Sequence, residues 1–466
     1  MQSAGYRRTV RFTGSAAGPA PLTWAQETTW ADISQFLPDV HDWFFMRGCA
    51  PVPAGLSLDT VLDRLGVLIG RHESVRSLLT FGDRVTQTAV AEGGVDVTVL
   101  PVAGAAVADT VDEQIIGLSQ SYFDHTREFP LRVIVVLADD IPAAVVFGIA
   151  HVFSDMRGAE IFGEQLGELL DAAADGLPEP PLPPCRQPVA EAVLERGPIG
   201  RRINAAAMSY LRKELESMQP SMFGPARPHD RPRFRTGLLS SRAAAVATPL
   251  VAQRLRTSTS AVLLAATAAI LRCATGVSTC HLGMICGNRF DPALRRTVGT
   301  LTETGLVSIA TDVATFDQLV PIAVEGSMRA LRYGRFDTLA QQALLAEIQQ
   351  DRGVPLDLRT RFNDMWSVAG ESRPTAGLRQ PASTFEWVAE TDNDTISFFL
   401  DIFGDPDEMR LRLLVDTYRI PDDAVPDLLT GFERLLIALV EHDVALADLP
   451  AVTGLRVSLA GQGIRG

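Results

Sequence analysis

Apolar residues recur every three or four positions between Leu56 and Arg71, which predicts a helix with one buried face. Two dense β-branched runs follow, Leu131–Leu137 and Ala143–Ala150, with two aspartates and a proline between them. These runs predict two strands joined by a short turn, the second buried on both faces. Apolar residues then return to helical spacing from Ile161 to Leu170. A histidine, His151, therefore lies where a buried strand ends and a helix is about to begin.

The second half of the chain alternates in the same way. Helical periodicity predicts three helices, at Pro198–Met218, Ser258–Thr275 and Asp422–His442. Runs rich in β-branched and aromatic residues predict four strands, at Thr279–Cys286, Thr384–Val388, Thr395–Phe403 and Arg410–Val415. Because helices and strands are mixed in both halves, we expect an α/β fold with two lobes.

A proline-rich stretch separates the halves. Gly176–Pro188 carries six prolines in thirteen residues, which excludes a helix or a central strand there. We interpret it as a linker between an N-terminal lobe, residues 1–180, and a C-terminal lobe, residues 181–466.

Composition and charge narrow the class of protein. The chain is 46% hydrophobic and 21% charged, an ordinary globular balance, and it has no apolar run long enough to cross a bilayer and no secretion signal. We therefore expect a cytoplasmic protein that does not bind membranes. The net charge of −14 argues against binding to nucleic acid or anionic lipid. The five cysteines form no CxxC pair and are expected to be free thiols, with no metal site.

One pair of residues has catalytic character. His151 has the residue type of a general base, and Asp155 follows it at the predicted junction of strand and helix. Two structural explanations compete with this one. Asp155 is of the type that caps a helix N-terminus, and His151 is of the type that a backbone carbonyl satisfies in a core. Residue types alone favour the structural explanations; the sequence contains no phosphate-binding glycine loop, no HExxH and no GxSxG.

The order of several short motifs changes this balance. They resemble, in family order, the motifs of the condensation domains of nonribosomal peptide synthetases. The matching segments are Pro21–Gln26 followed by Trp30, Arg71–Ser77 (RHESVRS), Phe123-Asp124 with Pro130–Arg132, His151–Asp155, Gly287–Arg289 with Val298-Gly299, and Asp357–Asp364. Within the family's HHxxxDG motif, His151 matches the second histidine and Asp155 the aspartate.

The resemblance implies a fold and a reaction. The family has two lobes similar to chloramphenicol acetyltransferase, set in a V around a tunnel. A carrier protein delivers an acyl or aminoacyl thioester on its phosphopantetheine arm, and a small-molecule amine or hydroxyl accepts the acyl group. By resemblance, His151 is the catalytic residue, Asp155 pairs with Arg289 of the second lobe to support the site, and the tunnel-lining candidates are Ala150, Ser154 and Met156. No cofactor is expected to bind directly.

Two departures from the motif open an alternative. Ala150 stands where the family has its first histidine, and Met156 where it has glycine. Relatives with altered motifs can lose catalysis and instead recruit another biosynthetic enzyme. The chain also lacks an adenylation domain and a GGxS carrier motif. We therefore expect a free-standing, monomeric acyltransferase that meets its carrier protein in trans, with two alternatives: a recruitment module, or a transferase that uses free coenzyme A thioesters.

Overall fold

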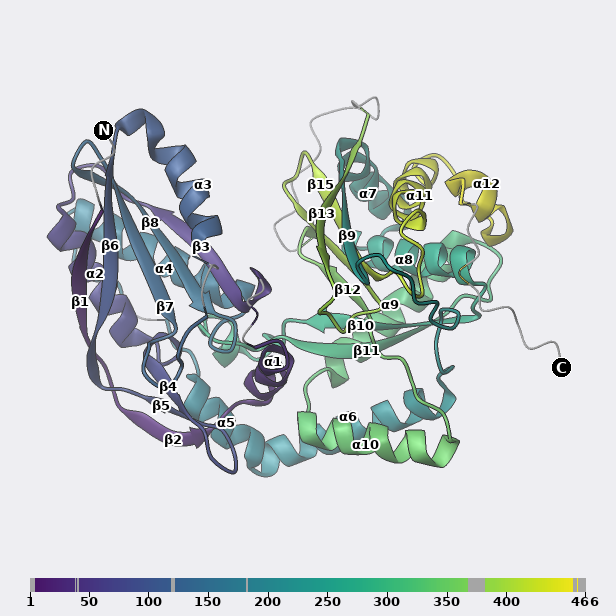
Figure 1. The fold of residues 1–466 in the computed structure, drawn as a ribbon, viewed down its shortest axis with the longest axis horizontal. Helices are drawn as coiled ribbons and strands as arrows, with labels where there is room; N and C mark the ends of the chain where they lie inside the picture. The colour runs from purple at the N-terminus through teal and green to yellow at the C-terminus, as the bar shows by residue number, and fades with distance from the viewer. Residues whose placement is uncertain are drawn as a thin grey trace. The chain divides into compact units, whose positions relative to one another are not determined.

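Helices and mixed sheets make up both halves of the chain, as the computed structural model shows (Figure 1). The structure describes residues 5–37, 39, 42–118, 122–181, 183–367, 382–455 and 459. The chain divides into two compact units. Unit 1 comprises Met1–Ala205 and Gly287–Glu303, and unit 2 comprises Ala206–Cys286 and Thr304–Gly466. The mixed helical and β architecture confirms the predicted class of fold.

The division differs in two respects from the boundary predicted at residue 180. First, the chain remains in unit 1 beyond the proline-rich stretch, because helix α5 (Pro188–Arg196) is held there. The buried carboxylate of Glu195 accepts a hydrogen bond of 2.8 Å from the backbone N–H of Trp24. Second, Gly287–Glu303 also folds into unit 1. Leu182, within the predicted linker, lies outside the described residues.

Unit 1 is built on a five-stranded sheet in the order β1-β6-β7-β8-β3. The strands are β1 (Tyr6–Thr13), β3 (Phe45–Pro51), β6 (Glu92–Val102), β7 (Leu131–Ala138) and β8 (Ile141–Ala150). Only β6 and β7 pair in parallel; the other neighbours are antiparallel. A smaller sheet has the order β2-β5-β4, formed by β2 (Ala17–Pro21), β4 (Ser77–Thr80) and β5 (Thr86–Ala89).

Helices pack on the large sheet of unit 1 and bury its apolar side chains. They are α2 (Leu58–Arg71), α3 (Val107–Gly117) and α4 (Met156–Ala174), while α1 (Trp24–Ser34) follows β2. The main core joins the sheet to the apolar faces of α2 and α4, where Leu65, Ile69 and Phe162 are fully buried. A smaller cluster joins the sheet to α3. The end of β8, which His151 follows directly, is therefore anchored in a well-packed core.

Unit 2 is built on a seven-stranded sheet in the order β11-β10-β12-β14-β15-β9-β13. The strands are β9 (Phe234–Ser241), β10 (Thr279–Cys286), β11 (Glu303–Ala310), β12 (Thr360–Asp364), β13 (Thr384–Thr391), β14 (Phe398–Gly404) and β15 (Met409–Asp416). The pairs β10–β12 and β12–β14 are parallel, and β14–β15, β15–β9 and β9–β13 are antiparallel.

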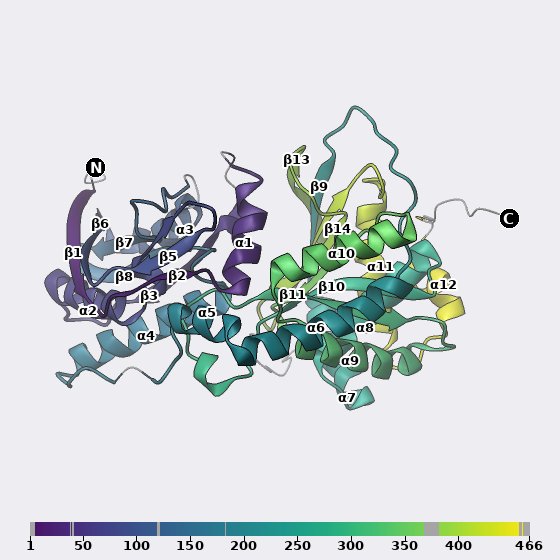
Figure 2. The same ribbon diagram turned by 90° about the horizontal axis from the view of Figure 1, so that it is seen from below.

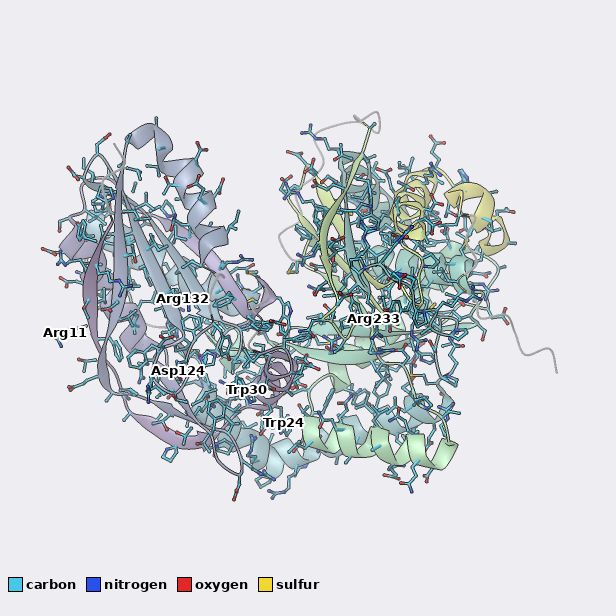
Figure 3. All side chains as sticks on the ribbon, viewed as in Figure 1. Arg11, Trp24, Trp30, Asp124, Arg132 and Arg233 are labelled. Atoms are coloured by element: carbon cyan, nitrogen blue, oxygen red, sulfur yellow. The ribbon has the colours of Figure 1, made fainter. Side chains whose placement is uncertain are left out.

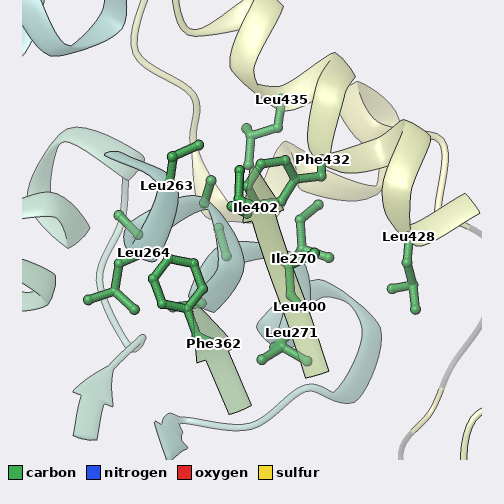
Figure 4. Packing of buried hydrophobic residues seen from close by; sticks show 14 of the residues in the cluster. Leu263, Leu264, Ile270, Leu271, Phe362, Leu400, Ile402, Leu428, Phe432 and Leu435 are labelled. Carbon is green, nitrogen blue, oxygen red and sulfur yellow. The ribbon is translucent and has the colours of Figure 1, made fainter. Parts of the chain in front are cut away.

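The helices of unit 2 cover this sheet. They are α7 (Arg242–Leu255), α8 (Thr259–Thr275), α9 (Phe316–Tyr333), α10 (Thr338–Arg352), α11 (Ala424–Ala438) and α12 (Leu449–Thr453). Figure 4 shows Leu264, Ile270 and Phe432 packed against strand residues such as Leu400. The helix α6 (Pro198–Ser217) starts in unit 1 and continues into unit 2, where it lies beside α10 (Figure 2).

The predicted elements agree closely with these bounds. The helix expected at Leu56–Arg71 is α2, and the two predicted strands before His151 are β7 and β8. The turn between them places Asp139 and Asp140 at positive φ, of 49° and 70°. Among the described residues, no single helix has the length and apolar composition needed to cross a membrane. Helices α7 and α8 have that length and composition only when taken together, and they are bent by 102° relative to each other.

Candidate functional site

His151 follows the last residue of β8 and precedes helix α4. Its backbone N–H donates to the carbonyl of Phe44, 2.8 Å away, which extends the pairing of β8 with β3 by one residue. Its ring Nδ1 lies 3.1 Å from the backbone carbonyl oxygen of Ser154. Because a carbonyl only accepts, this contact requires the proton on Nδ1 and leaves the lone pair on Nε2. The turn therefore selects the tautomer in which Nε2 is able to accept a proton.

Burial also keeps this histidine neutral. It lowers the pKa of His151 below its usual value, an effect that the Ser154 carbonyl and the Asp155 carboxylate only partly offset. The ring of Trp43 meets the imidazole edge to face, with ring centroids 6.2 Å apart. A neutral imidazole of fixed tautomer, oriented by a carbonyl and an aromatic ring, has the properties of a general base at neutral pH.

Asp155 is the N-cap of α4, and its side chain does more than cap the helix. Its Oδ1 accepts a hydrogen bond of 2.8 Å from the N–H of Gly158. Both carboxylate oxygens also pair with Arg289, at 2.7 and 2.8 Å. Asp155 is 1% exposed, and Oδ2 accepts two further bonds, from the N–H groups of Leu301 and Thr302. The predicted pair of Asp155 and Arg289 is thus present, and the N-cap explanation is also correct.

The segment Gly287–Glu303 supplies these partners from inside unit 1. The sequence-based boundary placed Arg289 in the second lobe; the structure places it in the same unit as Asp155 because this segment folds against the turn that carries His151. The hydroxyl of Thr300 donates to the carbonyl of His151. The hydroxyl of Ser74 donates to the carbonyl of Val298. The Thr300 contact was missed at the sequence level, since no motif marks it.

The three tunnel-lining candidates differ in their surroundings. Ala150 is 2% exposed and sits in β8, and Ser154 is fully buried, with its hydroxyl donating to the carbonyl of Asp155. Met156, the first residue of α4, is 39% exposed. With Met156 at this position, the Gly158 N–H still donates to the Asp155 carboxylate and the helix cap is formed. A Cβ on Gly158 would lie 2.6 Å from the Ser154 hydroxyl, so that glycine is required by packing. Their tunnel-lining role stays a prediction.

Two other family-like segments make buried contacts within unit 1. In the RHESVRS segment, His72 is fully buried and bonds to Gln165 of α4 at 2.8 Å, and Glu73 accepts from the N–H of Val189. Arg132, in the PLR segment, stacks over the Phe123 ring and donates to the carbonyl of Leu118. In unit 2, the ring of His281, on β10, bonds to the Ser308 hydroxyl at 3.0 Å. Within the described ranges, no group of three histidine, cysteine or acidic side chains is arranged to hold a metal ion.

The comparison with known families decides the assignment. The profile of the condensation domain family matches residues 16–419. The chain belongs to the condensation domain family. No curated protein sequence matches this condensation domain at a significant level.

Solved structures share the fold of this condensation domain. SgcC5 from Streptomyces globisporus superimposes with a TM-score of 0.66 at 20% identity, covering 90% of this chain and 98% of that one. The X-domain of teicoplanin biosynthesis, solved in complex with OxyB, gives 0.65 at 17% identity, covering 93% and 96%. The condensation domain of the Monacolin K polyketide synthase MokA gives 0.69 at 14% identity, covering 93% and 100%. At these identities the likeness concerns the fold alone.

Proposed function

We propose that this condensation domain is a cytoplasmic acyltransferase. It takes an acyl or aminoacyl group from the phosphopantetheine thioester of a carrier protein and transfers it to a small-molecule amine or hydroxyl. The observation that carries the proposal is the His151 ring, held neutral by burial and with its Nδ1 against the Ser154 carbonyl. Family membership supports the reaction class, since condensation domains work with carrier protein domains.

The proposed chemistry balances without a metal or redox cofactor. The lone pair of the acceptor nitrogen or oxygen attacks the thioester carbonyl, and the new C–N or C–O bond forms. The acceptor proton moves to Nε2 of His151, and the C–S bond breaks with its electron pair going to the sulfur of the arm, which leaves as a thiolate. The proton then passes from Nε2 to the departing sulfur. Asp155 and Arg289 act as positioning residues, because they brace the turn without reaching the ring.

The test is intact mass spectrometry of carrier proteins charged with acyl or aminoacyl groups, incubated with this protein and an amine. We expect the acyl mass to leave the carrier and appear on the amine. His151→Ala should abolish the transfer while the fold is retained, and His442→Ala, a change at an exposed histidine of unit 2, should not affect it. Unchanged turnover in His151→Ala would remove His151 from the mechanism. If a free coenzyme A thioester gave the same turnover, the donor would be the coenzyme A thioester and not a carrier protein.

A second candidate function is recruitment of another biosynthetic enzyme without chemistry. Two observations favour it: Ala150 and Met156 depart from the family motif, and X-domains are among the structural neighbours, one of them in complex with OxyB. This function predicts a stable complex in size-exclusion chromatography that survives His151→Ala. Transfer activity that depends on His151 would exclude it as the sole function.

A further inference from the structure

A cluster of aromatic rings lies beside the turn that carries His151. We call it the aromatic cluster; it consists of Trp30, Phe44, Tyr122, His125 and Phe153. The His125 ring is at its centre, with centroid distances of 5.1 Å to Tyr122, 5.4 Å to Phe153 and 6.3 Å to Trp30. Figure 3 labels Trp30, on α1, and Asp124, the residue before His125. Rings from α1, from the turn after β8 and from its own segment thus contact one imidazole, and Phe44 contacts the Tyr122 ring.

Three side-chain polar atoms of this cluster have no hydrogen-bond partner among the described residues. His125 is 3% exposed, and among the described residues neither of its ring nitrogens has a hydrogen-bond partner. The same holds for the hydroxyl of Tyr122, whose ring contacts that of His125. Buried donors and acceptors are nearly always paired, because an unpaired one loses its water without compensation. Three such atoms on two adjacent side chains indicate a place where an external polar group completes the bonding.

The aromatic cluster is linked to His151 by direct contacts. Phe153 belongs to the same turn, two residues after His151. The Trp43 ring contacts both the Phe44 ring, at 4.6 Å, and the His151 ring, at 6.2 Å. On its other side, Trp30 contacts Phe81, which is 48% exposed, at 5.1 Å. The rings therefore run from the protein surface to the proposed catalytic residue.

The charge state of the aromatic cluster restricts what it is able to bind. Burial lowers the pKa of His125 to about 4 and raises that of Tyr122, so both are neutral at pH 7. Two charged residues lie near His125: the Asp124 carboxylate favours a positive charge on its ring, and Arg132 disfavours one. The Arg132 guanidinium already donates to the carbonyls of Leu118 and Tyr122. Because this guanidinium is already engaged by backbone carbonyls, the hydrogen-bonding groups left for a ligand are the neutral side chains of His125 and Tyr122. Aromatic faces with one donor and one acceptor on each polar side chain suit a neutral ring that carries a hydroxyl, because a hydroxyl both donates and accepts.

We propose that the aromatic cluster is a binding site for a neutral aromatic group bearing a hydroxyl, bonded by His125 and Tyr122. This inference rests on the proposed function: the aromatic group is part of the substrate whose reacting atom meets His151. His125 and Tyr122 are then specificity-determining residues.

The experiment measures binding and needs no turnover. Isothermal titration of the full chain compares 4-hydroxybenzamide with benzamide. We expect the hydroxylated ring to bind about tenfold more tightly, which corresponds to about 1.4 kcal/mol. Tyr122→Phe and His125→Phe should remove that preference, and Tyr333→Phe, a change to a stacked tyrosine of unit 2, should leave it intact. Retention of the preference in His151→Ala would separate this site from the catalytic proposal.

Two outcomes would overturn the proposal. Equal affinities for the two probes, or no binding of either, would show that the aromatic cluster recognises no hydroxylated ring. A clear loss of stability in Tyr122→Phe, with the preference for 4-hydroxybenzamide unchanged, would show that an internal water or protein group already satisfies the hydroxyl. The melting temperature of each variant is measured alongside the titration, so that a misfolded variant is recognised.

Discussion

Removal of Asp155 should cost much more than removal of its partner Arg289. Asp155 receives five hydrogen bonds: two from Arg289, and three from the backbone N–H groups of Gly158, Leu301 and Thr302. In Asp155→Ala all five are lost, and a guanidinium that is 11% exposed is left without its anion. Breaking one side of such a buried pair costs about 3–5 kcal/mol.

Arg289→Ala leaves a different situation. The carboxylate keeps its three backbone donors, so the charge stays solvated by the protein. The loss is then that of bonds to a charged group, about 1–3 kcal/mol. In the double variant the unpaired guanidinium is gone, and we expect a cost no larger than that of Asp155→Ala alone. Arg295→Ala, at an exposed arginine of the same segment, is the control and should stay within about 0.5 kcal/mol.

Segment-resolved hydrogen exchange is the appropriate measurement because it reports local opening free energies. In Asp155→Ala the amides of Gly158, Leu301 and Thr302 should lose protection, since their acceptor is missing. In Arg289→Ala they should keep most of it. Equal effects of the two changes, or a double variant that simply adds them, would refute the view that the carboxylate is the centre of this network.

Three further outcomes follow from the structure. Burial lowers the pKa of His72 to about 4, so from pH 6.5 down to about 4 the unfolded chain binds a proton that the native site rejects, and the free energy of unfolding falls by about 1.4 kcal/mol per pH unit. Urea midpoints at several pH values should show this slope reduced in His72→Gln but not in His442→Gln. Thr300→Val removes the hydroxyl that donates to the His151 carbonyl. We expect this change to lower kcat more than it alters KM, and to lower the free energy of unfolding by about 1 kcal/mol. Met156→Ala should change the melting temperature little, because the side chain is 39% exposed, so any change in turnover reports on substrate access.

Local patterns in the sequence were sufficient for most elements of the fold. Helix α2 and strands β7 and β8 were predicted within a few residues, because apolar periodicity reflects which face of an element is buried. The junction at His151 and Asp155 followed from the same patterns. The order of the motifs was sufficient for the family, which the match over residues 16–419 confirms.

Only the tertiary structure decided which unit Arg289 belongs to and what surrounds the site. The bonds from Leu301 and Thr302 to Asp155 join residues 146 and 147 positions apart, and no local pattern encodes such pairings. The tautomer of His151 depends on where the Ser154 carbonyl points, and the unpaired state of His125 depends on the rings that α1 and the turn after β8 place around it. Periodicity determines which residues are buried, whereas the partners of buried polar groups depend on the path of the whole chain.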